Sequence, residues 1–284
     1  MTGPTMRTPA QSKIGAPPVP HEHGAWVMLY APIVIVAAAF PPPRLAGIML
    51  LTGAVTGIFL ARDVLGRVFR KRSTAGDRCW LAVYLLLTAG CAAPLMTPSD
   101  RRPLVEIAIL AAALFAVHSA LLLIPARKRL DRSQWGEVLA VGALSLTAPA
   151  ASVVVRGGLD AVAWCIWTAC TLYFSSSVFF VKMLLAATKY KDGFGLRERW
   201  AAGRDCVIYH ALLTAVCAFV ALQLGGRGGL LSTIAFAPAI LRAFAGWLRL
   251  SPKLPPLKVV GVFETVYALW FTALYVIAIR AGGS

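Results

Sequence analysis

Long apolar stretches separated by short polar segments form the pattern of this chain. A transmembrane helix needs about 20 mainly apolar residues, and stretches of about that length recur from residue 25 to residue 280. They predict nine membrane-spanning helices, over residues 25–40, 44–61, 79–97, 103–125, 137–155, 160–187, 205–224, 229–248 and 259–280. The predicted fold class is an all-α polytopic membrane protein. Residues 1–24 form a polar tail, and residues 25–284 form a single transmembrane domain.

The composition agrees with this pattern. Of the 284 residues, 58% are hydrophobic and 14% are charged, and the mean hydropathy is +0.72, which excludes an ordinary soluble domain. The formal charge of +16 comes from basic residues that stand between the apolar stretches, where they suit anionic lipid headgroups. We therefore expect the lipid bilayer as a partner and no nucleic acid. The six cysteines lie in or beside apolar stretches without a C-x-x-C pair, as small buried hydrophobes do.

The loop charges predict the orientation of the chain. The tail and every second loop together carry 20 Lys and Arg residues, whereas the loops on the opposite side carry six. Basic loops face the cytoplasm in membrane proteins, so the N-terminus is expected in the cytoplasm and the C-terminus outside. The expected location is the bacterial cytoplasmic (inner) membrane.

The junction between tail and first helix, Pro20–Trp26, is the first candidate site. Two histidines, His21 and His23, stand there beside Glu22, but two ligands with no Cys or third His nearby are a weak metal signal. Trp26 suits the membrane–water boundary, because its ring is apolar and its N–H needs a partner. The junction is either a solvated helix entry or a polar plug that reaches into a cytoplasmic cavity.

Six ionisable residues on six predicted helices share the cytoplasmic third of the membrane. They are His118, Glu137, Lys182, His210, Arg242 and Glu264. A charged side chain costs about 2.5–3.5 kcal/mol or more at the bilayer centre. Snorkelling, in which a long side chain reaches the interface, accounts for Arg242; the shorter side chains favour a shared polar cavity open to the cytoplasm. There we expect Glu264 to pair with Lys182, His210 or His23. The two intramembrane histidines, His118 and His210, are also candidate haem ligands.

The motifs of this chain resemble the YwiC-like family of bacterial integral membrane proteins. The motifs are His23–Leu29, Gly136-Glu137, Ala148–Ala151, Tyr173–Lys182, Tyr209-His210, Leu257–Gly261, and Glu264 with Tyr267 and Phe271. The resemblance covers nearly everything after residue 20, with Lys182 at a position where an Arg is expected. It implies a location in the membrane more than a particular chemistry.

A more distant resemblance is to the UbiA superfamily of intramembrane prenyltransferases. It implies a nine-helix bundle and functional loops after helices two and six, where Asp-rich motifs hold Mg²⁺ and a polyprenyl diphosphate. The corresponding segments here, 62–72 and 189–197, retain one aspartate each, Asp63 and Asp192, without a D-x-x-x-D pair. One carboxylate per loop is a poor Mg²⁺ cage, so a direct contact from basic residues such as Arg62 and Arg67 to an anionic headgroup is the alternative.

These observations lead to two hypotheses of function. The first is a protein that binds an isoprenoid or other anionic amphipathic lipid in a cytoplasm-facing cavity; as an enzyme it would be a prenyltransferase-like transferase, and turnover is left open. The alternative is a small-solute or ion transporter that uses Lys182, His210 and Glu264. The candidate ligand-binding residues are His23, Trp26, Arg62, Asp63, Arg67, Glu137, Lys182, Asp192, His210 and Glu264.

The loop charges generate a topology prediction. A reporter fused after Arg280 is expected on the outer side, and one inserted near Gly76 in the cytoplasm, because the basic loops alternate. The activity of each reporter shows on which side of the membrane its fusion point lies. Finding both reporters on one side would contradict the nine-span arrangement.

Overall fold

The computed structural model describes residues 16–19, 23–40, 44–69, 72–97, 101–123, 133–190 and 194–282. Regular structure within these ranges is helical. The helices are α1 (His23–Ala39), α2 (Leu45–Phe69), α3 (Ala75–Met96), α4 (Arg102–Leu123), α5 (Gln134–Ser145), α6 (Thr147–Arg156), α7 (Ala161–Ala187), α8 (Leu196–Leu224), α9 (Gly226–Leu248) and α10 (Leu257–Gly282).

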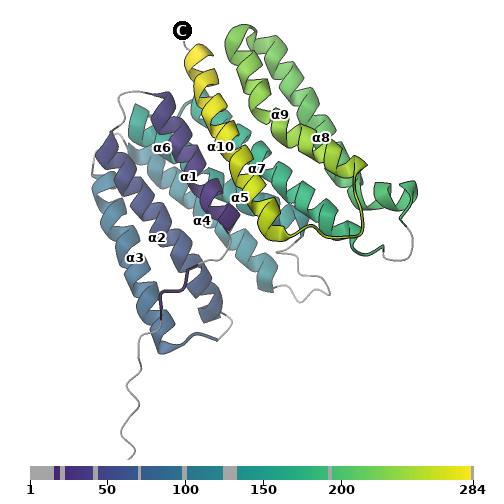
Figure 1. The fold of residues 1–284 in the computed structure, drawn as a ribbon. Helices are drawn as coiled ribbons and strands as arrows, with labels where there is room; N and C mark the ends of the chain where they lie inside the picture. The colour runs from purple at the N-terminus through teal and green to yellow at the C-terminus, as the bar shows by residue number, and fades with distance from the viewer. Residues whose placement is uncertain are drawn as a thin grey trace, which may run out of the picture.

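The helices lie side by side in a bundle (Figure 1). Helices α2 and α3 pair at one edge, α8 and α9 pair at the other, and α1, α6, α7 and α10 lie between them. Helix α6 is the most enclosed element, because every residue from Thr147 to Val155 is buried. The C-terminus lies at the opposite end of the bundle from the connection between α2 and α3.

The predicted fold class is confirmed. Among the described residues, eight helical segments are long and apolar enough to cross a membrane, with α5 and α6 together forming one of them over Gln134–Arg156. The first predicted span corresponds to the shorter apolar helix Gly24–Ala39. By length and composition the chain is therefore a multi-pass membrane protein.

The fifth predicted span, 137–155, differs from the prediction because it is two helices. Pro149 has no N–H to donate to the carbonyl of Ser145 one turn earlier. Helix α5 ends at Ser145 and α6 begins at Thr147, so Leu146 lies at the break. The apolar pattern continues through the break, which is why composition alone predicted one helix.

Two predicted cytoplasmic loops are shorter than the sequence suggested. Helix α2 continues to Phe69 and α8 begins at Leu196. Arg62, Asp63 and Arg67 therefore lie on the last turns of α2 rather than in a loop. Charged residues at i and i+4 on a helix face each other and stabilise it, and Asp63 and Arg67 form such a pair at 2.8 Å.

Two small residues on α2, Gly53 and Gly57, allow close contact with α3. A Cβ atom added at Gly53 would lie 2.6 Å from Sγ of Cys91. One added at Gly57 would lie 2.5 Å from Oγ1 of Thr88 and 2.8 Å from the carbonyl oxygen of Tyr84. The two helices thus pack backbone against backbone.

The turns at the opposite end are short and capped. Gly225 and Gly226 both have a φ of 58°, a conformation that suits glycine, and they turn the chain from α8 into α9. Asp160 caps α7 by accepting a bond of 3.0 Å from the amide of Ala163 and one of 2.8 Å from Nη1 of Arg156. Burial raises the pKa of Asp160, but the bonds from Arg156 and Ala163 outweigh it and hold that pKa below its ordinary value of 3.8.

The contact between α2 and α3 generates a matched stability prediction. Gly57→Ala is expected to destabilise the protein by about 1–3 kcal/mol, because the new methyl group overlaps the backbone of α3. Gly66→Ala in the same helix meets nothing within 4 Å and should stabilise by up to about 1 kcal/mol. Thermal unfolding in detergent compares the variants. A higher Tm for Gly57→Ala than for Gly66→Ala would contradict the packing.

Candidate functional site

A largely buried ion pair lies between α7, α9 and α10. Arg242 of α9 forms an ion pair with Glu264 of α10, and the two side chains are 11% and 18% exposed. The guanidinium lies 4.3 Å from the ring centroid of Phe180 and 5.6 Å from that of Tyr267. Aromatic faces attract a cation, so the Arg242 side chain is fixed by a carboxylate and two rings.

A hydrogen-bonded chain continues from Arg242 into α7 and α8. Nη2 of Arg242 donates to Oγ of Ser176 at 3.4 Å, and that oxygen lies 2.8 Å from Nε2 of the fully buried His210. Nδ1 of His210 lies 2.7 Å from the carbonyl of Cys206. A carbonyl only accepts, so Nδ1 carries a proton. Both ring nitrogens of His210 are therefore engaged in hydrogen bonds, which leaves neither available to haem iron.

Glu264 has a second partner, because the hydroxyl of Ser177 donates to its Oε2 atom. We call Arg242, Glu264, Ser176, Ser177 and His210 the Arg242 cluster. Four helices contribute to it, and each of its charged groups has a partner of opposite charge or a hydrogen bond. A buried ion pair is tolerated only with such supporting bonds.

Glu264 has a partner that the prediction did not name. Its ion pair in the described residues is with Arg242, and the side chain of His23, one of the three predicted partners, lies outside those residues. Snorkelling of Arg242 was wrong, since its side chain is only 11% exposed and packs between α7 and α10. The sequence held a signal for this pair. Arg242 lies about two turns before the end of α9, and Glu264 lies about two turns after the start of α10, so the connection between the two helices brings both residues to the same end of the bundle.

Lys182 and Glu137 form a second pair, between α7 and α5. Nζ of Lys182 lies 2.6 Å from Oε1 of Glu137, with side chains 25% and 37% exposed. Both were predicted site residues, and the structure brings them together. Ser133 caps the start of α5 through a bond of 3.1 Å from the amide of Gly136, which places Glu137 in the first helical turn.

Beside this pair lies a hollow of about 290 Å³ between the start of α5, the end of α7 and the first turns of α8. We call it the α5–α7–α8 hollow. Its polar lining residues are Gln134, Lys182, Lys189 and Asp205. Its apolar wall includes Phe179, Met183, Leu185 and Cys206. The hollow is therefore amphipathic, with two lysines beside an apolar wall. Its lining includes Cys206, whose backbone carbonyl accepts the hydrogen bond from His210.

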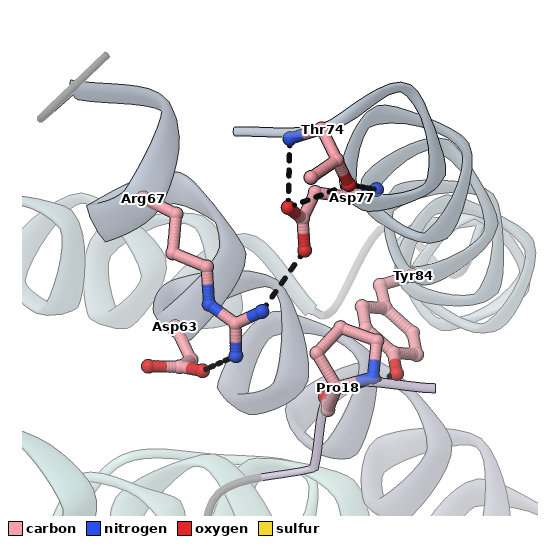
Figure 2. A network of polar contacts seen from close by, with 6 residues as sticks. All are labelled: Pro18, Asp63, Arg67, Thr74, Asp77 and Tyr84. Carbon is pink, nitrogen blue, oxygen red and sulfur yellow. Dashed lines mark hydrogen bonds and ion pairs between the residues drawn. The ribbon is translucent and has the colours of Figure 1, made fainter. Parts of the chain in front are cut away.

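A third group of polar contacts, the α2–α3 network, joins α2 to α3 (Figure 2). Arg67 donates to Asp63 at 2.8 Å and to Asp77 at 3.0 Å. Asp77 also accepts bonds from the amide and hydroxyl of Thr74, which completes the capping box of α3. Arg67 is thus engaged by two carboxylates, an arrangement that fastens the helix pair.

The N-terminal segment contacts the same helix pair. The hydroxyl of Tyr84 on α3 donates to the carbonyl of Pro18 at 3.2 Å, and Figure 2 shows Pro18 beside Tyr84. The described part of the tail therefore lies against α3.

The remaining predicted site residues are distributed over the structure. Trp26 is half-buried and packs on Phe59 and Tyr30, with ring centroids 4.8 and 5.9 Å away. Arg62 is half-buried on α2. Asp192 lies outside the described residues. The predicted residues thus do not form one site: His210 and Glu264 join the Arg242 cluster, and Lys182 lines the hollow with Glu137 as its ion-pair partner.

A site for Mg²⁺ does not emerge from the described residues. No three His, Cys, Asp or Glu side chains gather there as metal ligands. Asp63, one of the two aspartates considered for Mg²⁺, is paired with Arg67.

Comparisons with known proteins confirm the resemblance to the YwiC-like family. A family model described as "YwiC-like protein" matches residues 19–152. The chain is 28% identical over 265 residues to a protein of Bacillus subtilis (strain 168) described as "Uncharacterized protein YwiC", across 90% of this chain and 95% of that protein. No solved structure matches the chain. The more distant resemblance to the UbiA superfamily is not confirmed by these comparisons.

The Arg242 cluster generates a stability prediction. Glu264→Gln leaves the buried charge of Arg242 without its counter-ion, which typically costs about 3–5 kcal/mol. The control Arg204→Gln removes an ion pair with Asp205 whose side chains are 64% and 59% exposed, worth about 0–1 kcal/mol. Unfolding of both variants in the same detergent measures the difference. Equal stability would show that the Arg242–Glu264 pair is not buried.

Proposed function

We propose that this YwiC-like protein, a multi-pass protein of the bacterial cytoplasmic membrane, binds an anionic amphipathic lipid such as an isoprenoid phosphate. The α5–α7–α8 hollow is the proposed binding site. One observation carries the proposal: two lysines, Lys182 and Lys189, line the same hollow as a wall of apolar side chains.

The chemistry of the lining suits such a ligand. Ammonium groups bind phosphate oxygens through charge-assisted hydrogen bonds, which are about twice as strong as neutral ones. Phe179, Met183 and Leu185 offer an apolar surface to the first carbons of a chain. The volume of about 290 Å³ is at the lower end of the range for small-molecule pockets, so it fits a headgroup with its first methylenes while the rest of the chain lies in the bilayer.

The ion pair of Lys182 with Glu137 supports a fixed geometry at the mouth of the hollow. Lys182 is held at 2.6 Å by a carboxylate on the neighbouring helix. Such an orientation reduces the entropy lost when a ligand binds.

We propose binding rather than turnover, because the paired Asp63 gives no support to metal-assisted ionisation of a diphosphate.

The second candidate function is transport of a small solute or an ion. The buried charges of the Arg242 cluster favour it, because ionisable residues inside a membrane often mark a substrate or ion path. The sequence of the outer halves of α9 and α10 argues against transport. No charged residue lies between Arg227 and Arg242 on α9, or between Glu264 and Arg280 on α10. This one-sided distribution supports the binding hypothesis.

Ligand binding to purified protein tests the proposal. Farnesyl diphosphate serves as the anionic probe and farnesol as its uncharged counterpart. Lys189→Gln removes one charged contact, worth about 1.5–3 kcal/mol, so its Kd for farnesyl diphosphate should rise about tenfold or more. Its Kd for farnesol should not change.

Lys253→Gln is the matched control. Lys253 is an exposed lysine between α9 and α10 and does not line the hollow. Its Kd for farnesyl diphosphate should stay within about twofold of the wild type, because an exposed distant charge is screened. Equal affinity of Lys189→Gln and Lys253→Gln for farnesyl diphosphate would place the binding site elsewhere.

A further inference from the structure

The charges at the α5–α7–α8 hollow come close to balancing. The charged residues of its described lining are Lys182, Lys189 and Asp205. Lys182 pairs with Glu137 at 2.6 Å, and Asp205 pairs with Arg204 at 3.3 Å. Three cations and two carboxylates therefore lie in or directly beside the hollow, a net charge of one positive unit. Each ion pair balances itself, which leaves the charge of Lys189.

This net charge distinguishes between kinds of phosphate headgroup. A phosphate monoester carries a charge of about −1.5 to −2 at pH 7, and a diphosphate carries more. A phosphodiester carries a single negative charge. Because a charge without a counter-charge is costly to remove from water, the headgroup that the lining balances is the phosphodiester.

The lining also offers hydrogen-bond acceptors that a phosphate cannot use. Asp205 meets Arg204 through its Oδ1 atom, and a carboxylate has a second oxygen with further lone pairs. Gln134, at the first position of α5, adds an amide group to the same hollow. Both side chains accept hydrogen bonds from hydroxyl groups, and a hydroxyl bond to a carboxylate is about twice as strong as a neutral one. The hollow thus has a cation for a phosphate and acceptors for hydroxyls.

The position of Asp205 on α8 places this carboxylate at the level of the lipid headgroups. About 20 residues cross the hydrocarbon core, whereas α8 has 29. The excess lies at its start, because the charged residues Arg197, Glu198, Arg199 and Arg204 precede Asp205 and no Lys, Arg, Asp or Glu follows it on this helix. A headgroup in the hollow can therefore reach Asp205 while its chain stays in the bilayer.

We propose that the ligand of the hollow is a lipid phosphodiester whose second ester group carries hydroxyls, such as a glycerol or a sugar. Lys189 binds the phosphate oxygens. Asp205 and Gln134 accept hydrogen bonds from the hydroxyls, and Phe179 contacts the first carbons of the chain. This inference rests on the proposed function, since it uses the same hollow, and it names the class of headgroup.

Binding of two lysolipids to the full chain in detergent tests this headgroup class. Lysophosphatidylglycerol and lysophosphatidylmethanol carry the same single charge and are used with the same acyl chain, so they differ in the hydroxyls of the headgroup. The Kd of the wild type for lysophosphatidylglycerol should be lower by about tenfold or more, as expected for a hydrogen bond to a charged group. Equal Kd values for the two lysolipids would overturn the proposal.

Asp205→Ala assigns the preference to one side chain. Its affinity for lysophosphatidylglycerol should fall to that for lysophosphatidylmethanol, while its affinity for lysophosphatidylmethanol should not fall. The Asp205 side chain is 59% exposed, so the fold tolerates its loss. The control is Glu106→Ala, because Glu106 is an exposed acid on α4 that does not line the hollow; this variant should keep the full preference. An unchanged preference in Asp205→Ala would contradict the role of this carboxylate.

Lysophosphatidic acid, a monoester with the same acyl chain, tests the charge of the headgroup. Its Kd should be no lower than that of lysophosphatidylglycerol, although its own charge is higher. A tenfold lower Kd for lysophosphatidic acid would refute the match to a phosphodiester.

Lys189→Gln separates this inference from the proposed function. The variant should weaken the binding of lysophosphatidylglycerol and lysophosphatidylmethanol alike, because both present a phosphate. If it does so while the wild type binds both equally, the lipid site stands and the recognition of hydroxyls is wrong. If it weakens neither lysolipid nor farnesyl diphosphate, the proposed function itself fails.

Discussion

The ion pair between Arg242 and Glu264 is the interaction on which the arrangement of the C-terminal helices depends. Removing two charges from water costs several kcal/mol per ion, and only good geometry with further hydrogen bonds repays it. Ser177 supplies such a bond to Glu264, and the ring of Phe180 supports the guanidinium. These partners come from α7, so α9 and α10 cannot rotate or slide relative to α7 without exposing an unpaired charge to the bilayer.

The same cluster connects to the hollow through one residue. Cys206 accepts the bond from His210 with its backbone carbonyl, and its side chain belongs to the wall of the α5–α7–α8 hollow. The helix that holds the cluster in place therefore also forms one wall of the proposed binding site. His210 in turn bonds to Ser176 of α7 at 2.8 Å, so the Arg242 cluster ties the helix that forms this wall to α7.

The sequence predicted the helices far better than it predicted their contacts. Apolar length is a property of the chain alone, which is why the spans were found. Contacts depend on how each helix is rotated, and a long side chain such as Arg242 can turn outward to the interface or inward to Glu264. The α5–α6 break was missed because the stretch as a whole is apolar enough for one span, although Ser145, Thr147 and Pro149 marked it. Asp63 was considered for Mg²⁺ through the resemblance to the UbiA superfamily, and the sequence did not show that Arg67 pairs with it.

Mass spectrometry of the lipids that co-purify with the protein tests the central claim most directly. The wild type is compared with Ala202→Phe, which places a ring in the wall of the hollow and reduces its volume without changing a charge. The account predicts an anionic amphipathic lipid in near-stoichiometric amount with the wild type and its depletion from Ala202→Phe. The same lipid profile in both proteins would contradict binding in the α5–α7–α8 hollow.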